Sequence, residues 1–139
     1  MKTSLPLVCL VIDDDADDID FFKMAVSNLS LPIEVLAFTD CNLAIEKLLN
    51  SEIDPHVIVL DSRFNTTNGH ECLEKIKTKL DIKEIPVIIV TGGISEIEEA
   101  QYADAGVYKS LKKPNTIEDL QTLLKTEFTL LFPSLKKYI

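Results

Sequence analysis

The stretch LVCLVIDDD, residues 7–15, places three aspartates directly after six apolar residues. Two further apolar runs end in a similar way, since VIVL (57–60) stops at Asp61 and IPVIIV (85–90) stops at Thr91. If the three runs lie side by side in one parallel sheet, their carboxyl ends meet at one edge. Open α/β sheets bind ligands at that edge. The sequence therefore predicts a polar functional site there.

Length and composition indicate a single globular domain spanning residues 1–139, because the chain is 139 residues long and 46% hydrophobic. The net charge of -9 argues against direct nucleic-acid binding through a basic face. The first apolar run is too short to cross a bilayer and no signal-peptide pattern is present, so we expect a cytoplasmic protein without membrane insertion.

The three cysteines, odd in number and irregularly spaced, do not predict a disulfide framework. Cys9 is expected to pack as a small hydrophobe.

Strand-like and helix-like segments alternate along the chain. Strands are expected at residues 7–12, 33–38, 56–60, 86–90 and 106–111. The helices between them are expected to begin at residues suited to capping, namely Asp15, Thr39 or Asp40, Ser95 with Glu98 in a capping box, and Asn115 or Thr116. Five such βα units with right-handed crossovers predict a doubly wound three-layer α/β sandwich. Residues 132–139 form a C-terminal extension that either enlarges a binding surface or packs back on the domain.

The residues at the strand ends have a shared chemistry. Asp13, Asp14 and Asp61 offer the oxygen ligands that a hard cation such as Mg²⁺ prefers. Carboxylates this close repel one another, so at least one pKa should be raised when no cation is bound. An aspartate can also act as a nucleophile that forms an acyl phosphate, with Lys113 and the Thr91 hydroxyl contacting the phosphoryl oxygens. The set predicts a site for a divalent cation and a phosphoryl group.

In combination, four stretches resemble the receiver domain of bacterial response regulators: VIDDD (11–15), VIVLDSRFNTTNG (57–69), PVIIVTGG (86–93) and SLKKP (110–114). The resemblance covers nearly the whole chain. It implies a flavodoxin-like fold with a five-stranded parallel sheet in the order 2-1-3-4-5. It also implies a stand-alone regulator, similar to chemotaxis regulators, that accepts a phosphoryl group from a histidine kinase or a phosphotransfer protein and signals to a downstream protein. Such a protein modifies itself and is not an enzyme.

Carried over position by position, the resemblance assigns roles to individual residues. Asp61 is the phospho-acceptor, Thr91 the switch hydroxyl and Lys113 the lysine that contacts the phosphoryl group. The implied ligands of Mg²⁺ are Asp14, Asp61, the backbone carbonyl of Arg63 and, through a water, Asp13. The resemblance also places a glycine, Gly69, after the active-site loop and a peptide bond that is often cis before Pro114.

The chain departs from the family pattern in ways that bear on signalling. Phe64–Asn65 stands where a Met-Pro pair is common. Arg63 either contributes its carbonyl alone or reaches the phosphoryl group and alters the lifetime of the phosphoaspartate. Ser110 occupies the position of the aromatic switch residue, with Tyr108 nearby. The expected output face is built by the fourth helix, fifth strand and fifth helix, and includes Ile97, Tyr102, Tyr108 and Ser110.

The sequence also allows three other interpretations of the protein's function. A phosphorylation-independent receiver-like scaffold is compatible with Ser110 and the altered loop. A phosphohydrolase with an aspartyl nucleophile shares the carboxylates and the lysine, but Arg63 stands where such enzymes usually carry a second acid. A flavodoxin-like or dinucleotide-binding domain is disfavoured, because the loop after the first strand is rich in aspartate and would repel phosphate.

Overall fold

A computed structural model of the chain describes residues 5–62, 69–79 and 85–139. Five parallel strands form one sheet in the order β2-β1-β3-β4-β5, as the resemblance implied. The strands are β1 (Leu7–Ile12), β2 (Ile33–Phe38), β3 (Val57–Asp61), β4 (Val87–Thr91) and β5 (Lys109–Lys112). The helices are α1 (Ala16–Ser27), α2 (Cys41–Leu49), α3 (Gly69–Lys79), α4 (Glu96–Asp104) and α5 (Ile117–Leu131), followed by the 3₁₀ helix η2 (Pro133–Tyr138).

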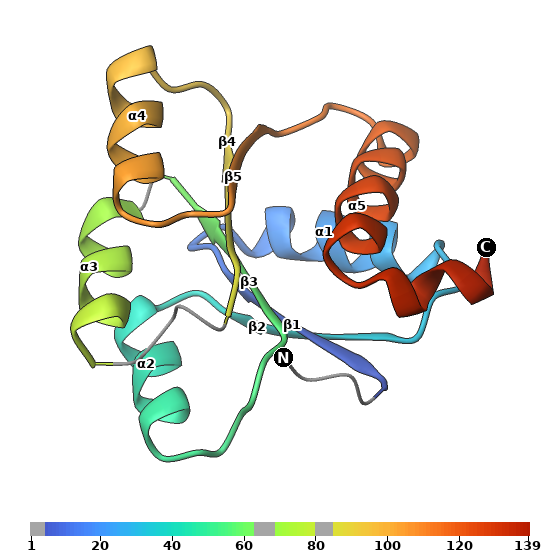
Figure 1. Cartoon of the computed structure of the whole chain (residues 1–139), viewed down its shortest axis with the longest axis horizontal. Helices are drawn as coiled ribbons and strands as arrows, with labels where there is room; N and C mark the ends of the chain where they lie inside the picture. Colours follow the sequence, from blue (N-terminus) through green and yellow to red (C-terminus); the bar gives the residue numbers. More distant parts are fainter. Residues whose placement is uncertain (1–4, 63–68, 80–84) are drawn as a thin grey trace.

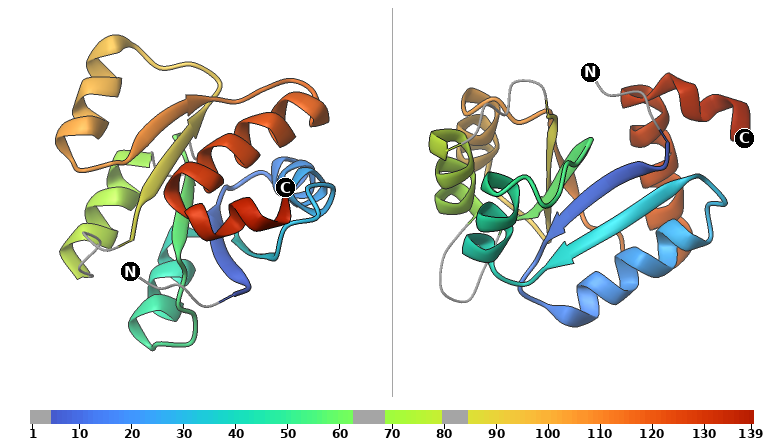
Figure 2. Two further views of the ribbon diagram at one scale, coloured as in Figure 1. Left: turned by 45° about the vertical axis from the view of Figure 1, so that its right-hand side comes forward. Right: turned by 90° about the horizontal axis from the view of Figure 1, so that it is seen from below.

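Helices cover both faces of the sheet, which gives the predicted three-layer sandwich (Figure 1). α1 and α5 lie on one face, and α2, α3 and α4 lie on the other (Figures 1 and 2). Each face has its own apolar cluster, because β1, β3 and β4 are apolar at nearly every position and bury side chains in both directions. Because β1, β3 and β4 are parallel neighbours held in the core, their carboxyl ends lie together at one edge of the sheet.

The helices begin where the capping residues predict. Asp15 accepts a hydrogen bond from the Asp17 N–H at 2.9 Å, and Ser95 with Glu98 forms the expected capping box. For the two helix starts at which the sequence allowed either of two caps, the caps are Asp40 and Thr116.

Within the described ranges, no helix has the length and apolarity needed to cross a membrane.

The strand boundaries differ from the predicted ones by small shifts that matter for the site. β3 and β4 each extend one residue further and end on Asp61 and Thr91 themselves. β5 is shorter than predicted and starts at Lys109, so Tyr108 lies just outside it with an exposed ring. As a result, Asp61 and Thr91 are held by strand hydrogen bonding and not by a loop.

The C-terminal extension packs back on the domain. Phe132 and Leu135 are buried in the apolar cluster on the α1 and α5 face. The Phe132 ring meets the ring of His56 edge-on, with 6.2 Å between centroids. His56 is itself buried, and its Nδ1 accepts a hydrogen bond from the Val8 N–H at 2.9 Å. The extension thus completes the core at the end of the sheet opposite the aspartates.

The structure contains a disulfide that the cysteine count did not predict. Cys41, the first residue of α2, is bonded to Cys72 of α3, with their Cα atoms 5.9 Å apart. Both residues are buried against the sheet between these helices. Cys9 is the unpaired third cysteine, fully buried as expected, and its burial raises the pKa of its thiol. The expectation failed because spacing along the chain does not reveal which helices lie side by side.

Candidate functional site

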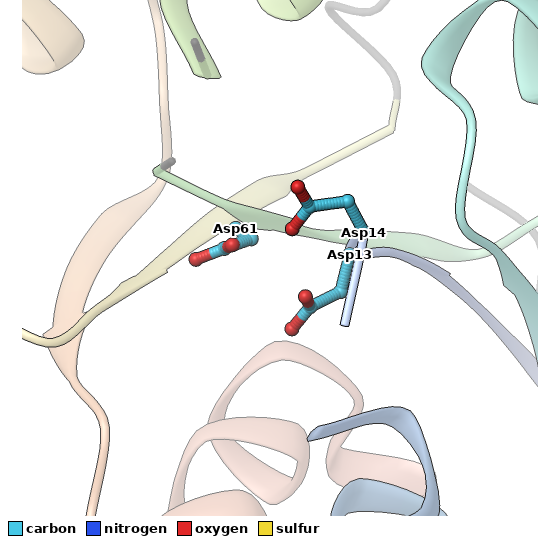
Figure 3. Close-up of side chains that lie close together, drawn as sticks. All are labelled: Asp13, Asp14 and Asp61. Atoms are coloured by element: carbon cyan, nitrogen blue, oxygen red, sulfur yellow. The ribbon is translucent and has the colours of Figure 1, made fainter. Parts of the chain in front are cut away.

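Three carboxylates converge at the carboxyl edge of the sheet. Asp13 and Asp14 follow β1, and Asp61 ends the neighbouring strand β3 (Figure 3). The strand register sets this proximity, because Ile12 pairs with Leu60. One oxygen from each of the three carboxylates lies within 4.8 Å of the others, a spacing suitable for one metal ion. A hard cation with oxygen ligands, such as Mg²⁺, fits this donor set.

Asp13 is the most buried member of the cluster, with 6% of its surface exposed. Its Oδ1 accepts a hydrogen bond from the Asp15 N–H at 3.0 Å, and Lys113 lies 3.6 Å from its Oδ2. Burial raises the pKa of Asp13 above its ordinary value, and the nearby charges of Asp18 and Asp14 add to this, whereas the hydrogen bond and Lys113 oppose it. The pKa of one carboxylate is thus raised, as predicted, but burial and not repulsion between carboxylates is the main cause.

We expect Asp13→Asn to raise the free energy of unfolding of the metal-free protein by about 1 kcal/mol at neutral pH. A raised folded-state pKa means that the ionised carboxylate opposes folding, and an uncharged amide can still accept the Asp15 N–H bond. Urea denaturation in the presence of a chelator measures the difference. The difference should shrink as the pH falls from the raised pKa of folded Asp13 to the ordinary aspartate pKa, because the wild-type carboxyl becomes neutral in the folded protein over that range. A less stable variant at neutral pH would contradict the expectation.

Lys113 reaches the cluster from the end of β5 and contacts a residue that the sequence did not single out. Its backbone N–H donates to the Thr91 carbonyl at 2.7 Å, which ties it to the end of β4. Its Nζ donates to Asp18 Oδ2 of α1 at 2.7 Å. Burial disfavours the ammonium, but the Asp18 hydrogen bond and the charges of Asp13, Asp18 and Asp61 outweigh it and raise the pKa of Lys113. Lys113 is therefore a fixed cation beside the carboxylates.

Thr91 is buried at the end of β4, next to the strand that carries Asp61. Its Oγ1 accepts a hydrogen bond from the Gly93 N–H at 3.0 Å. The β3–β4 register pairs Asp61 with Val90, so Thr91 lies one residue further along the same edge. The structure thus brings Thr91 to the same end of the sheet as the carboxylates and Lys113.

Gly69, the first residue of α3, makes a close approach that a side chain would prevent. A Cβ there would lie 2.6 Å from the Tyr102 hydroxyl and 2.9 Å from the Asp61 backbone oxygen. Its N–H also donates to the Ser62 carbonyl at 3.0 Å. Tyr102 itself is 1% exposed, which corrects the prediction that it belongs to the output face. Tyr102 is the buried residue of α4, and it packs inward into the apolar cluster that α2, α3 and α4 share with the sheet.

We expect Gly69→Ala to lower the free energy of unfolding by about 1–3 kcal/mol, the usual cost of forcing atoms into a filled space. Alanine favours helices more than glycine does, so a loss of stability at a helical position would come from the steric contact. The matched control is Gly92→Ala, where a Cβ meets nothing within 4 Å. Urea denaturation of both variants checks this, and equal stabilities would refute the steric explanation.

The remaining candidates are the two predicted switch residues and the loop after Asp61. Ser110 lies half-buried on β5 opposite Ile89, and the exposed Tyr108 ring has the Lys109 ammonium 5.9 Å from its centroid. Their switch role stays a prediction. Arg63 and the Phe64–Asn65 pair lie outside the described residues. The peptide bond before Pro114 is trans; the cis bond found in the described ranges precedes Pro6.

Comparison with known proteins agrees with this arrangement. The sequence profile of the response regulator receiver domain matches residues 9–125. The chain is 31% identical over 118 residues to the chemotaxis protein CheY1 of Helicobacter pylori, covering 84% of this chain and 92% of that protein. It is 24% identical over 123 residues, 88% of this chain, to the sensor histidine kinase CheAY of the same species, but spans 15% of that protein.

Solved structures show the same fold. The Mn²⁺-bound form of response regulator Rcp1 matches with a TM-score of 0.77 at 23% identity, covering 91% of this chain and 95% of that one. The range matched by the family profile, residues 9–125, spans the residues that the fold gathers at one edge of the sheet, namely Asp13, Asp14, Asp61, Thr91 and Lys113. The chain therefore belongs to the receiver-domain family of response regulators.

Proposed function

We propose that this receiver domain accepts a phosphoryl group on Asp61 in a Mg²⁺-dependent reaction. The observation that carries the proposal is the convergence of Asp13, Asp14 and Asp61 within 4.8 Å, with the Lys113 ammonium 3.6 Å from Asp13. This arrangement combines a carboxylate nucleophile, a donor set for a hard cation and a fixed positive charge. The structure of Rcp1, whose fold matches this chain, holds Mn²⁺, which supports the divalent-cation part of the proposal.

The chain's own residues supply most of the chemistry. An Asp61 carboxylate oxygen attacks phosphorus, the P–N bond of a phosphohistidine breaks, and the leaving imidazole takes up a proton. Lys113 attracts the phosphoryl oxygens as a point charge, and the Thr91 hydroxyl donates to one of them. A Mg²⁺ ion held by Asp14, Asp61, the Arg63 carbonyl and, through a water, Asp13 would neutralise charge on the phosphoryl group.

The relatives support a place in two-component signalling or a phosphorelay. The donor would be a histidine kinase or a phosphotransfer protein, and a downstream protein would read the α4, β5 and α5 face through changes at Thr91, Ser110 and Tyr108. On this proposal the protein acts in the cytoplasm and makes no direct contact with nucleic acid. It catalyses no reaction beyond its own phosphorylation and dephosphorylation.

The test is intact-mass analysis after incubation with phosphoramidate. We expect one added phosphoryl group when Mg²⁺ is present and none when a chelator is present. A receiver known to be labelled under the same conditions serves as the positive control. No adduct beside a labelled control would refute the proposal in favour of a phosphorylation-independent scaffold. Sustained turnover of a small phosphate ester would instead indicate a phosphohydrolase.

A further inference from the structure

Lys113 has two anionic partners at the site, and the nearer one lies outside the three-carboxylate cluster. Its Nζ is 2.7 Å from Asp18 Oδ2 and 3.6 Å from Asp13 Oδ2. The shorter contact is a charge-assisted hydrogen bond, whereas the longer one is an ion pair beyond hydrogen-bonding distance. Of these two anions, Asp18 is therefore the one that holds the ammonium by a hydrogen bond.

The position of Asp18 follows from the way α1 begins. Asp15 caps the helix, and Asp18 lies one turn further along, where it is half-buried and faces the site. Asp13, Asp18, Asp61 and Lys113 line one cavity, together with apolar side chains of β1, β3, β4, α1 and α5. Asp17, its neighbour on the same helix, is exposed instead. Asp18 is thus placed to interact with the lysine in a way that a neighbouring aspartate of equal charge is not.

We propose that Asp18 is a positioning residue that holds the Lys113 ammonium nearer to itself than to Asp13, so that the oxygens of the three carboxylates stay available to the divalent cation. Without Asp18, the anions that still attract Lys113 are Asp13 and Asp61, whose oxygens the metal also needs. A lysine drawn onto these oxygens would compete with the metal for them. The inference rests on the proposed function and specifies how the site keeps two cations apart.

The test is a double-mutant cycle with Mg²⁺ affinity as its readout, measured by calorimetric titration without any phosphoryl donor. The four proteins are the wild type, Asp18→Asn, Lys113→Ala and the double variant. Asp18→Asn is expected to weaken Mg²⁺ binding about threefold to tenfold when Lys113 is present, in the lower part of the range found for coupled neighbours. In the Lys113→Ala background it should change the affinity little, because the competing ammonium is gone. Asp17→Asn is the matched control for charge and should have the smaller effect.

Each outcome bears on the proposal. Equal weakening by Asp18→Asn in both backgrounds would show that Asp18 acts as a general negative charge and would overturn the inference while leaving the proposed function intact. Failure of the wild type to bind Mg²⁺ would overturn both. The substitution preserves shape at a side chain that is 35% exposed, so the variant should remain folded, and thermal melting verifies this.

Discussion

Asp61→Asn is expected to abolish uptake of a phosphoryl group from phosphoramidate, to below the detection limit of intact-mass analysis. The amide of asparagine is a far weaker nucleophile than a carboxylate, and no acyl phosphate forms on it. Asp13, the most buried neighbouring carboxylate, is not expected to replace Asp61. Asp13 is buried and paired with the Asp15 N–H and Lys113, and it follows a different strand. The loss should therefore be complete and not partial.

The matched control for Asp61→Asn is Asp20→Asn, which removes the same charge from an exposed position on α1. It should be labelled like the wild type. Both variants need to melt cooperatively, so that a lost adduct is not confused with a lost fold. An adduct on Asp61→Asn would show that another residue accepts the phosphoryl group and would contradict the assignment of Asp61.

Ending the chain at Leu131 is expected to leave a protein that is largely unfolded or melts far below the full-length chain. The deletion removes Phe132 and Leu135, which are 5% and 0% exposed in the core cluster of the α1 and α5 face. Loss of one buried phenylalanine and one buried leucine costs about 5 kcal/mol or more. A domain of this size is stable by only about 5–15 kcal/mol. Thermal and urea denaturation measure the effect.

A pair of leucine substitutions separates core packing from other effects of the deletion. Leu135→Ala removes a fully buried side chain and should cost about 2–5 kcal/mol. Leu130→Ala makes the same chemical change at a side chain that is 58% exposed and should stay within about 0.5 kcal/mol. Equal effects of the two would mean that the extension does not contribute through burial.

The parts of the structure that could be predicted are those determined locally in the sequence. Strands buried on both faces need apolar residues at nearly every position, so β1, β3 and β4 could be read directly. Parallel strands then bring their carboxyl ends to one edge whatever the details of packing. This geometric rule is why Asp13, Asp14 and Asp61 could be grouped in advance.

The features that escaped prediction are pairings between distant elements. Asp18 and Lys113 are 95 positions apart, and Cys41 and Cys72 are 31 apart. Neither pair has a spacing that marks it, because each depends on how helices pack against a sheet that the sequence describes only in outline. Tyr102 was misplaced for a related reason: α4 buries one residue, and a single inward position produces no periodic pattern.

The state of the three cysteines has a practical consequence for spectroscopy. Cys9 is a buried thiol, and Cys41 and Cys72 are consumed in a disulfide, so no native cysteine offers a reactive thiolate at the surface. The chain also has no tryptophan to report on its conformation. A cysteine introduced at exposed Ile97 of α4 would therefore be the single position to take up a maleimide fluorophore or spin label under non-reducing conditions. No native cysteine would take up the label, and no tryptophan would add fluorescence of its own.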